Sequence, residues 1–337
     1  MVSFGINLLP DEILRMIFVN LNNVHLENVL LVCLRWRNIG ETVWICNKMI
    51  IQKSEVHWLL INRLAKIEDL SLSKQWSSDN FVEFLSVCEQ LLYLKRLTLL
   101  NLNLSYVELS QMVSIFQVFE SIDFGKSHLP IDYLKTTFDA IAVSRKMKVL
   151  KIDNNNLSKV DIETLASVVN KLEEIHMQNC SLTALQSKSI FAKMMEIKTM
   201  KILRIGGNIL SSINENILSS AVIHLSEAHL NGCRLNTSQL NLLFEKLRKE
   251  EVKLKKLDVS FNNLSMINQE SLNFSATRLL MANLSFTRLS KEQIESYFEQ
   301  IIINSSLSFL SMNRSMLKNL NKSLVRQVNK QVRHFFC

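Results

Sequence analysis

Glycine and proline are scarce in this chain, with 6 and 2 residues among 337. This scarcity excludes collagen and proline-rich linkers and argues against turn-dense β-sandwiches and barrels. No run of apolar residues is long enough for a membrane span. The 6 cysteines form no CxxC pair, and the first residues lack the pattern of a signal peptide. We therefore expect no transmembrane helix, and a reduced cytoplasmic or nuclear location.

Motifs of catalysis are missing as well. The chain contains no G-x-S-x-G, no P-loop, no H-E-x-x-H and no G-x-G-x-x-G. We therefore expect a protein that is not an enzyme and that needs no cofactor.

An internal repeat fills most of the chain instead. The template L-x-x-L-x-L-x-x-N/C-x-L, with other apolar or small residues allowed at the leucine positions, recurs along the sequence. Its clear copies are 147–157, 172–182, 200–210, 225–235, 254–264 and 279–289, and weaker copies begin at 67, 94, 119 and 307. Successive starts alternate between a separation of 25 residues and one of 27 to 29. The pattern resembles leucine-rich repeats of the ribonuclease-inhibitor-like subclass.

The residue type at the ninth position of the template alternates from one repeat to the next, as the repeat length does. It holds asparagine at Asn155, Asn208 and Asn262, and cysteine or threonine at Cys180, Cys233 and Thr287. Each copy predicts a short strand whose apolar side chains and ninth residue point inward. Return segments such as 159–170 and 239–249 have apolar residues at helical spacing. Because no repeat buries its apolar face alone, we expect an α/β solenoid of about ten repeats, a curved parallel sheet with helices outside.

The segment before the repeats has a different pattern. Pro10 and the acidic residues Asp11 and Glu12 suit the first turn of a helix. Apolar residues then follow at helical spacing through Leu21, and a second such stretch ends at Trp36. The segment resembles an F-box, a small all-α domain, at Leu9-Pro10-x-Glu12-Ile13-Leu14, Ile17-Phe18-x-x-Leu21, Leu26, Val32-Cys33-x-x-Trp36 and Trp44. His25 departs from the family, in which an acid often precedes this leucine.

The resemblance implies a division into domains and a set of contact residues. The predicted domains are an F-box at 5–48, a connector or first partial repeat at 49–66, leucine-rich repeats at 67–317 and a basic amphipathic cap at 318–337. F-boxes bind a Skp-type adaptor, and through it a cullin and a RING subunit. The resemblance implies a set of residues of which some pack in the F-box core and others contact the adaptor. They are Leu9, Pro10, Ile13, Leu14, Ile17, Phe18, Val32, Cys33, Trp36 and Trp44. We expect Pro10, Ile13 and Leu14 to make the contact, whereas a plain helical cap would bury them on the solenoid.

Residues between the leucine positions project from the predicted concave sheet. The middle positions mix acidic, basic and neutral side chains, so a uniform phosphate-binding stripe is not visible and nucleic acid is not the expected partner. One end is apolar, because Phe261 and Phe286 occupy the eighth position of adjacent repeats. The residues predicted to bind a protein substrate on the concave face are Arg204, His229, Phe261, Met281, Phe286 and Phe309. Burial of this cluster under the C-terminal tail is the alternative interpretation.

His176 and His229 do not form a predicted metal site. They lie two strands apart, about 10 Å, with Arg204 between them, whereas zinc ligands lie about 2 Å from the ion. Cys180 and Cys233 are expected to face the interior.

The last segment combines apolar and basic stripes at helical spacing. Six of the eight net positive charges follow Ile301, where no acid occurs. A terminal cap is the simplest interpretation, and an acidic substrate, nucleic acid or an anionic membrane surface are alternatives.

Together these features resemble F-box/leucine-rich-repeat substrate receptors of Skp–cullin–F-box ubiquitin ligases. That resemblance implies that the repeats bind the target protein for ubiquitination. The alternative hypothesis is a non-catalytic leucine-rich-repeat binding or inhibitor module with no ligase role.

Overall fold

The computed structural model describes residues 9–19, 36, 49–51, 68–72, 84, 94–102, 104–105, 107–249 and 251–336. The chain divides into two compact units, Met1–Ser127 and His128–Cys337, and each is described by itself. No helix among these residues is long and apolar enough to cross a membrane.

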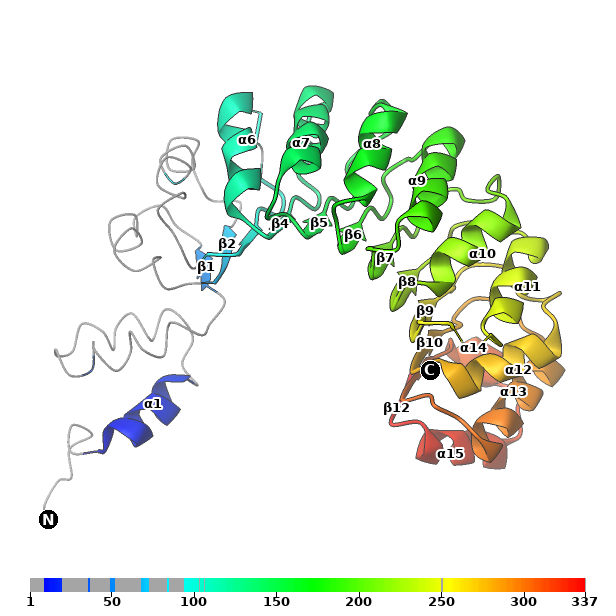
Figure 1. The fold of residues 1–337 in the computed structure, drawn as a ribbon. Coiled ribbons are helices and arrows are strands. Elements are labelled where there is room, and N and C mark those ends of the chain that lie inside the picture. Colours follow the sequence, from blue (N-terminus) through cyan, green and yellow to red (C-terminus); the bar gives the residue numbers. More distant parts are fainter. Residues whose placement is uncertain are drawn as a thin grey trace, which may run out of the picture. The chain divides into compact units, whose positions relative to one another are not determined.

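The described part of the first unit contains two helices and four strands (Figure 1). Helix α1 (Asp11–Val19) comes first. Strands β1 (Met49–Ile51), β2 (Asp69–Leu72) and β3 (Arg96–Thr98) follow, then α6 (Leu109–Val118) and β4 (Ser121–Asp123). The four strands pair in parallel and in chain order. Strand β1 adds one repeat strand ahead of the first predicted copy.

Eight strands of the second unit also pair in parallel and in chain order. They are β5 (Val149–Lys151), β6 (Glu174–His176), β7 (Ile202–Arg204), β8 (Glu227–His229), β9 (Lys256–Asp258), β10 (Met281–Asn283), β11 (Phe309–Ser311) and β12 (His334–Phe336). Strands β2 to β11 each begin two residues after a predicted repeat start. The predicted leucine-rich-repeat fold is therefore confirmed, and the predicted domain boundaries stay predictions.

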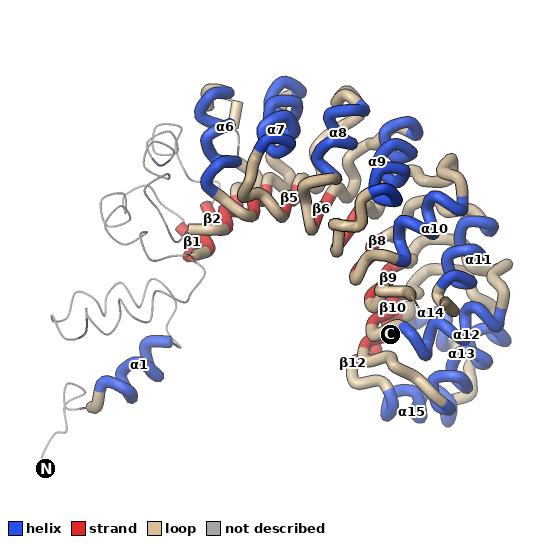
Figure 2. The backbone as a smooth tube through the Cα atoms, in the orientation of Figure 1, coloured by secondary structure: helices blue, strands red, loops and turns tan. Residues whose placement is uncertain are grey.

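Helices alternate with these strands and lie along their outer side in the second unit (Figure 2). They are α7 (Ile131–Val143), α8 (Ile162–Val169), α9 (Ala184–Glu196), α10 (Glu215–Ile223), α11 (Thr237–Lys246), α12 (Gln269–Arg278), α13 (Lys291–Ile303), α14 (Arg314–Leu317) and α15 (Lys322–Gln331). Neighbouring helices and strands enclose a continuous core, because the leucine positions of each repeat are buried.

The ninth position of the six clear repeats points inward, as expected from its residue types. Asn155, Asn208 and Asn262 are at most 4% exposed, and the two cysteines are completely buried. Each cysteine thiol donates to a backbone carbonyl of the preceding repeat, Cys180 to Ile152 and Cys233 to Ile205. The ninth residues therefore join neighbouring repeats through buried hydrogen bonds.

The C-terminal segment is a helix followed by a strand. Helix α15 packs Val328 into the interior next to α13, as a terminal cap does. The chain then turns into β12, which extends the sheet beyond β11 and which the helical pattern of the tail did not predict. Phe335 and Phe336 contact Phe298 and Phe309, with ring centroids 5.9 Å and 5.1 Å apart.

Candidate functional site

Helix α1 presents different sets of residues to the interior and to solvent. The backbone N–H groups of Ile13 and Leu14 both donate to the carbonyl of Pro10, so the helix begins directly after the proline. Leu14 and Phe18 are at most 1% exposed, and the Phe18 ring lies 5.5 Å from that of Trp36. These three side chains hold the helix in place.

The opposite side of the helix is open. Pro10 is exposed, Ile13 is 41% exposed, and Leu9 and Ile17 are half-buried. Val32, Cys33 and Trp44 lie outside the described residues. Of the three residues expected to make the contact, Pro10 and Ile13 are therefore accessible and Leu14 is not.

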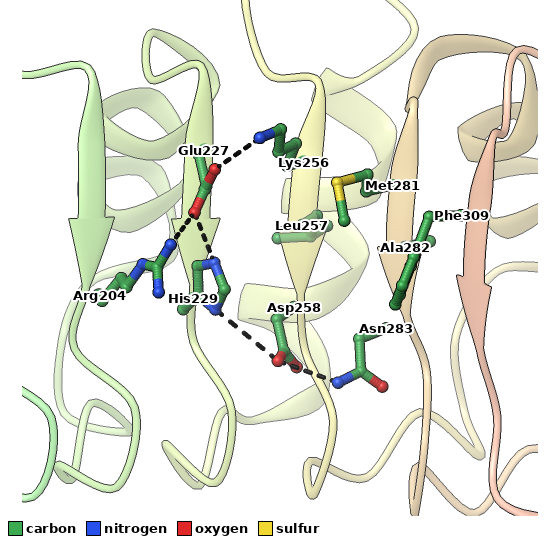
Figure 3. A pocket seen from close by; sticks show the side chains of 10 residues that line it. All are labelled: Arg204, Glu227, His229, Lys256, Leu257, Asp258, Met281, Ala282, Asn283 and Phe309. Atoms are coloured by element: carbon green, nitrogen blue, oxygen red, sulfur yellow. Dashed lines mark hydrogen bonds and ion pairs between the residues drawn. The ribbon is translucent and has the colours of Figure 1, made fainter. Parts of the chain in front are cut away.

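A network of charged side chains crosses strands β7 to β10 of the second unit. Figure 3 shows the Glu227 carboxylate of β8 between Arg204 on β7, His229 on β8 and Lys256 on β9. Its oxygens lie 2.7 Å from Arg204 Nη2, 2.8 Å from His229 Nε2 and 3.1 Å from Lys256 Nζ. Parallel pairing creates this cluster, because Arg204, His229 and Asp258 occupy the same register position on adjacent strands.

The electrostatics of Glu227 follow from these neighbours. Burial alone would raise the pKa of this carboxyl group. Hydrogen bonds from Lys256 and His229 and the charge of Arg204 outweigh burial and lower its pKa to about 2. Glu227 is therefore ionised throughout the physiological range and fixes the positions of the three basic side chains.

The network continues to an apolar end. His229 Nδ1 lies 3.8 Å from Asp258 Oδ2, which accepts a hydrogen bond from Asn283 Nδ2 at 3.0 Å. Met281 and Phe309, both half-exposed, come next on β10 and β11. Together these strands form an open hollow of about 260 Å³, which brings together four predicted substrate residues, Arg204, His229, Met281 and Phe309.

The other two predicted substrate residues lie at the loop edge of the sheet. The rings of Phe261 and Phe286 stack 4.6 Å apart at 13°, and their side chains are 61% and 54% exposed. The C-terminal tail does not bury them, since β12 lies beside β11. They line a second hollow with Arg234 and Arg288.

The two histidines considered for a metal lie beside carboxylates of their own strands. His176 Nε2 lies 2.7 Å from Glu174 Oε1, and His229 bonds Glu227. Burial, together with the positive charges of Arg204 and Lys151, lowers the pKa of His176 to about 3. Among the described residues, no three or more His, Cys, Asp or Glu side chains form a group that could hold a metal ion.

Comparison with known proteins identifies the N-terminal segment. Residues 6–46 match the F-box-like family model. The F-box-like segment spans helix α1 with its exposed Pro10 and Ile13, and leucine-rich repeats follow it. The match confirms the resemblance to an F-box that the spacing of Leu9 to Trp44 indicated.

Solved structures resemble the fold over most of the chain. The leucine-rich-repeat-containing protein LegL7 from Legionella pneumophila has a TM-score of 0.51 at 14% identity, covering 84% of this chain and 98% of its own. A structure of the yeast Rad7 and Elc1 complex has a TM-score of 0.56 at 16% identity, covering 94% of this chain and 79% of that one. No curated protein sequence matches the chain.

Sequence reasoning missed several residues that shape these surfaces. Glu227 and Lys256 were not singled out, although aligning the repeats places them one strand apart at the same template position. Ser127 is the ninth residue of a weak repeat and donates to the Leu99 carbonyl at 2.8 Å, as the cysteines do in theirs.

Proposed function

We propose that this chain is the substrate-recognition subunit of a Skp–cullin–F-box type ubiquitin ligase. The F-box-like segment binds the adaptor, and the repeats bind the target protein. The chain contributes no catalytic group and acts by holding the target near the ubiquitin-carrying subunits.

The observation that carries this proposal is the exposed side of α1 within a segment that matches the F-box-like model. A helix that served only as a cap would bury Pro10 and Ile13. Instead their apolar surface faces solvent above a core of Leu14, Phe18 and Trp36, as an adaptor-docking surface requires. The structural likeness to the Rad7 and Elc1 complex agrees with a chain that binds a partner protein.

The substrate surface is proposed for the second unit. Arg204, His229, Met281 and Phe309 combine ordered charges with half-exposed apolar side chains in one hollow, the composition of many protein-binding sites. The target contacts this face while the adaptor holds the N-terminal segment.

Adaptor binding is tested by co-expression with a Skp-type adaptor, followed by size-exclusion chromatography. We expect a one-to-one complex that Ile13→Glu abolishes, because the new carboxylate would be buried without a partner. Ile209→Glu is the matched control, since Ile209 is 49% exposed in the second unit, and it should leave the complex intact. A chain that ignores the adaptor would instead support a binding or inhibitor module without a ligase role.

A further inference from the structure

The eighth residue of the second to ninth repeats adopts a left-handed backbone conformation. Its φ angle lies between 52° and 73° in every repeat from the second to the ninth. The residues at this position are Asn101, Lys126, Asn154, Asn179, Gly207, Gly232, Phe261 and Phe286. Glycine and asparagine are the residues that tolerate this conformation best, whereas an aromatic residue is unfavourable there. The eighth and ninth repeats therefore keep phenylalanine where the backbone disfavours it.

Burial does not explain the two phenylalanines. More than half of each side chain is exposed, and the rings cover only one face of each other. Their backbones are fixed, because Phe261 N–H donates to the Ser285 carbonyl and Phe286 N–H donates to the Asn313 side chain at 2.7 Å. A rigid, exposed aromatic pair is typical of a binding surface.

Positive charge surrounds this pair. Arg234 and Arg288 line the same hollow and are exposed. Neither has an ion-pair partner within the part of the chain that the structure describes. The loops 231–236, 260–267, 285–290 and 312–316 contain these two arginines and Arg314, and no acidic residue. The edge is thus apolar at its centre and basic around it.

We propose that this edge binds an acidic linear peptide that carries an aromatic side chain. The aromatic residue packs on the Phe261–Phe286 pair, and carboxylates pair with Arg234 and Arg288. These arginines follow strands two apart, so their backbones are separated by about 10 Å, which three residues of extended chain span. The inference rests on the proposed function in one respect, namely that this peptide belongs to the ubiquitination target.

A charge on a neighbouring strand favours a peptide over a nucleic acid. Asp258 lies at the end of β9, the strand that leads into the loop of Phe261. Its negative charge would repel a continuous phosphate backbone, whereas a short peptide avoids it by remaining at the loop edge.

Fluorescence anisotropy with labelled peptides tests the inference on the full chain, with and without a Skp-type adaptor. The probe contains Glu-Ser-Trp-Glu between glycine-serine flanks, which places its acids three residues apart. We expect it to bind at least about tenfold more tightly than the same peptide with Lys for Glu or Gly for Trp. Added salt should weaken binding, because exposed charges are screened.

Two variants assign the binding to this edge. Phe261→Asn with Phe286→Asn should weaken binding at least about tenfold, as loss of a central aromatic contact does. Asparagine already fills the same position at Asn154 and Asn179, so this variant should fold and keep the adaptor. Arg234→Gln with Arg288→Gln should also weaken binding and reduce its salt dependence. Arg326→Gln, an exposed arginine of α15, is the matched control and should change nothing.

The outcomes separate this inference from the proposed function. Adaptor binding without peptide binding would overturn the inference alone, and peptide binding without adaptor binding would overturn only the ligase role. Unchanged peptide binding by the double phenylalanine variant would also overturn the inference. So would tighter binding of oligouridine RNA than of the peptide, or a dimer of the chain that the phenylalanine variant abolishes.

Discussion

Asn208 shows how one buried side chain joins adjacent repeats. Its amide donates to the carbonyls of Met177 and Ile205 at 2.7 and 2.8 Å, and its oxygen accepts from the backbone N–H groups of Cys180 and Leu182 at 3.1 Å. These groups have no access to water once the repeats stack. Satisfied buried polar groups stabilise the fold because leaving one unpaired is costly.

Replacing this asparagine should therefore destabilise the second unit strongly. We expect Asn208→Ala to lower the free energy of unfolding by about 3 kcal/mol, since several buried backbone groups lose their partner. Urea denaturation followed by circular dichroism measures the change. Asn263→Ala is the control, because Asn263 is exposed and its side chain accepts a hydrogen bond from the Ser265 N–H of its own loop. A loss for Asn208→Ala no larger than for this control would contradict the account.

His176 makes stability depend on pH. Its pKa is lowered from 6.5 to about 3 in the folded chain, chiefly by burial. Below pH 6.5 the unfolded chain therefore binds a proton that the folded chain does not, and stability falls as the pH falls. His176→Gln should show a smaller decrease in its urea midpoint between about pH 7 and about pH 5 than the parent chain. An equal decrease in both proteins would show that His176 does not contribute.

Residue types at the ninth position were predictable, but the charged network was not. Asparagine, cysteine and threonine at one repeating position are enough to imply inward side chains. Glu227 is different, since its carboxylate is buried against Arg204 of β7, His229 of β8 and Lys256 of β9. The register of neighbouring strands brings those groups together, and no local sequence pattern predicts that these side chains contact one another.

Helix boundaries depend on capping residues more than on apolar spacing. The segment predicted from residue 239 begins two residues earlier as α11 (Thr237–Lys246), because Asn236 caps it. The Gln239 side-chain oxygen accepts a hydrogen bond from the Asn236 N–H, and its amide group donates to the carbonyls of Leu210 and Ile213. Thr183 with Gln186 forms a similar capping box. The spacing of these residues was visible in the sequence, whereas the bonds to the previous repeat were not.

The terminal helix α15 closes the core of the second unit through Val328, which is completely buried. Val328→Asp should lower the free energy of unfolding by about 3 kcal/mol, because it buries a charge among apolar groups. Gln327→Asp, at an exposed neighbouring position, should change stability by less than about 1 kcal/mol. Thermal unfolding of both variants tests this. Equal stability would mean that α15 is not a cap.

At the scale of the whole molecule, periodicity made the architecture predictable and left the target undetermined. Leucines at fixed spacing specify repeats because each repeat must bury its face against the next. The side chains that project from the strands carry no such constraint, so their order does not follow from the fold. Strand β12 was also not predicted, since a three-residue strand after a basic helix leaves no periodic signal.

The central claim is that this chain connects a target to a ubiquitin ligase. The most direct measurement is the composition of the assembly formed when the purified chain, adaptor, cullin and RING subunit are mixed and separated by size-exclusion chromatography. The account predicts one peak that contains all four, from which Ile13→Glu removes this chain and Ile209→Glu does not. A chain that binds the adaptor but keeps the cullin out, or that elutes alone, would contradict it.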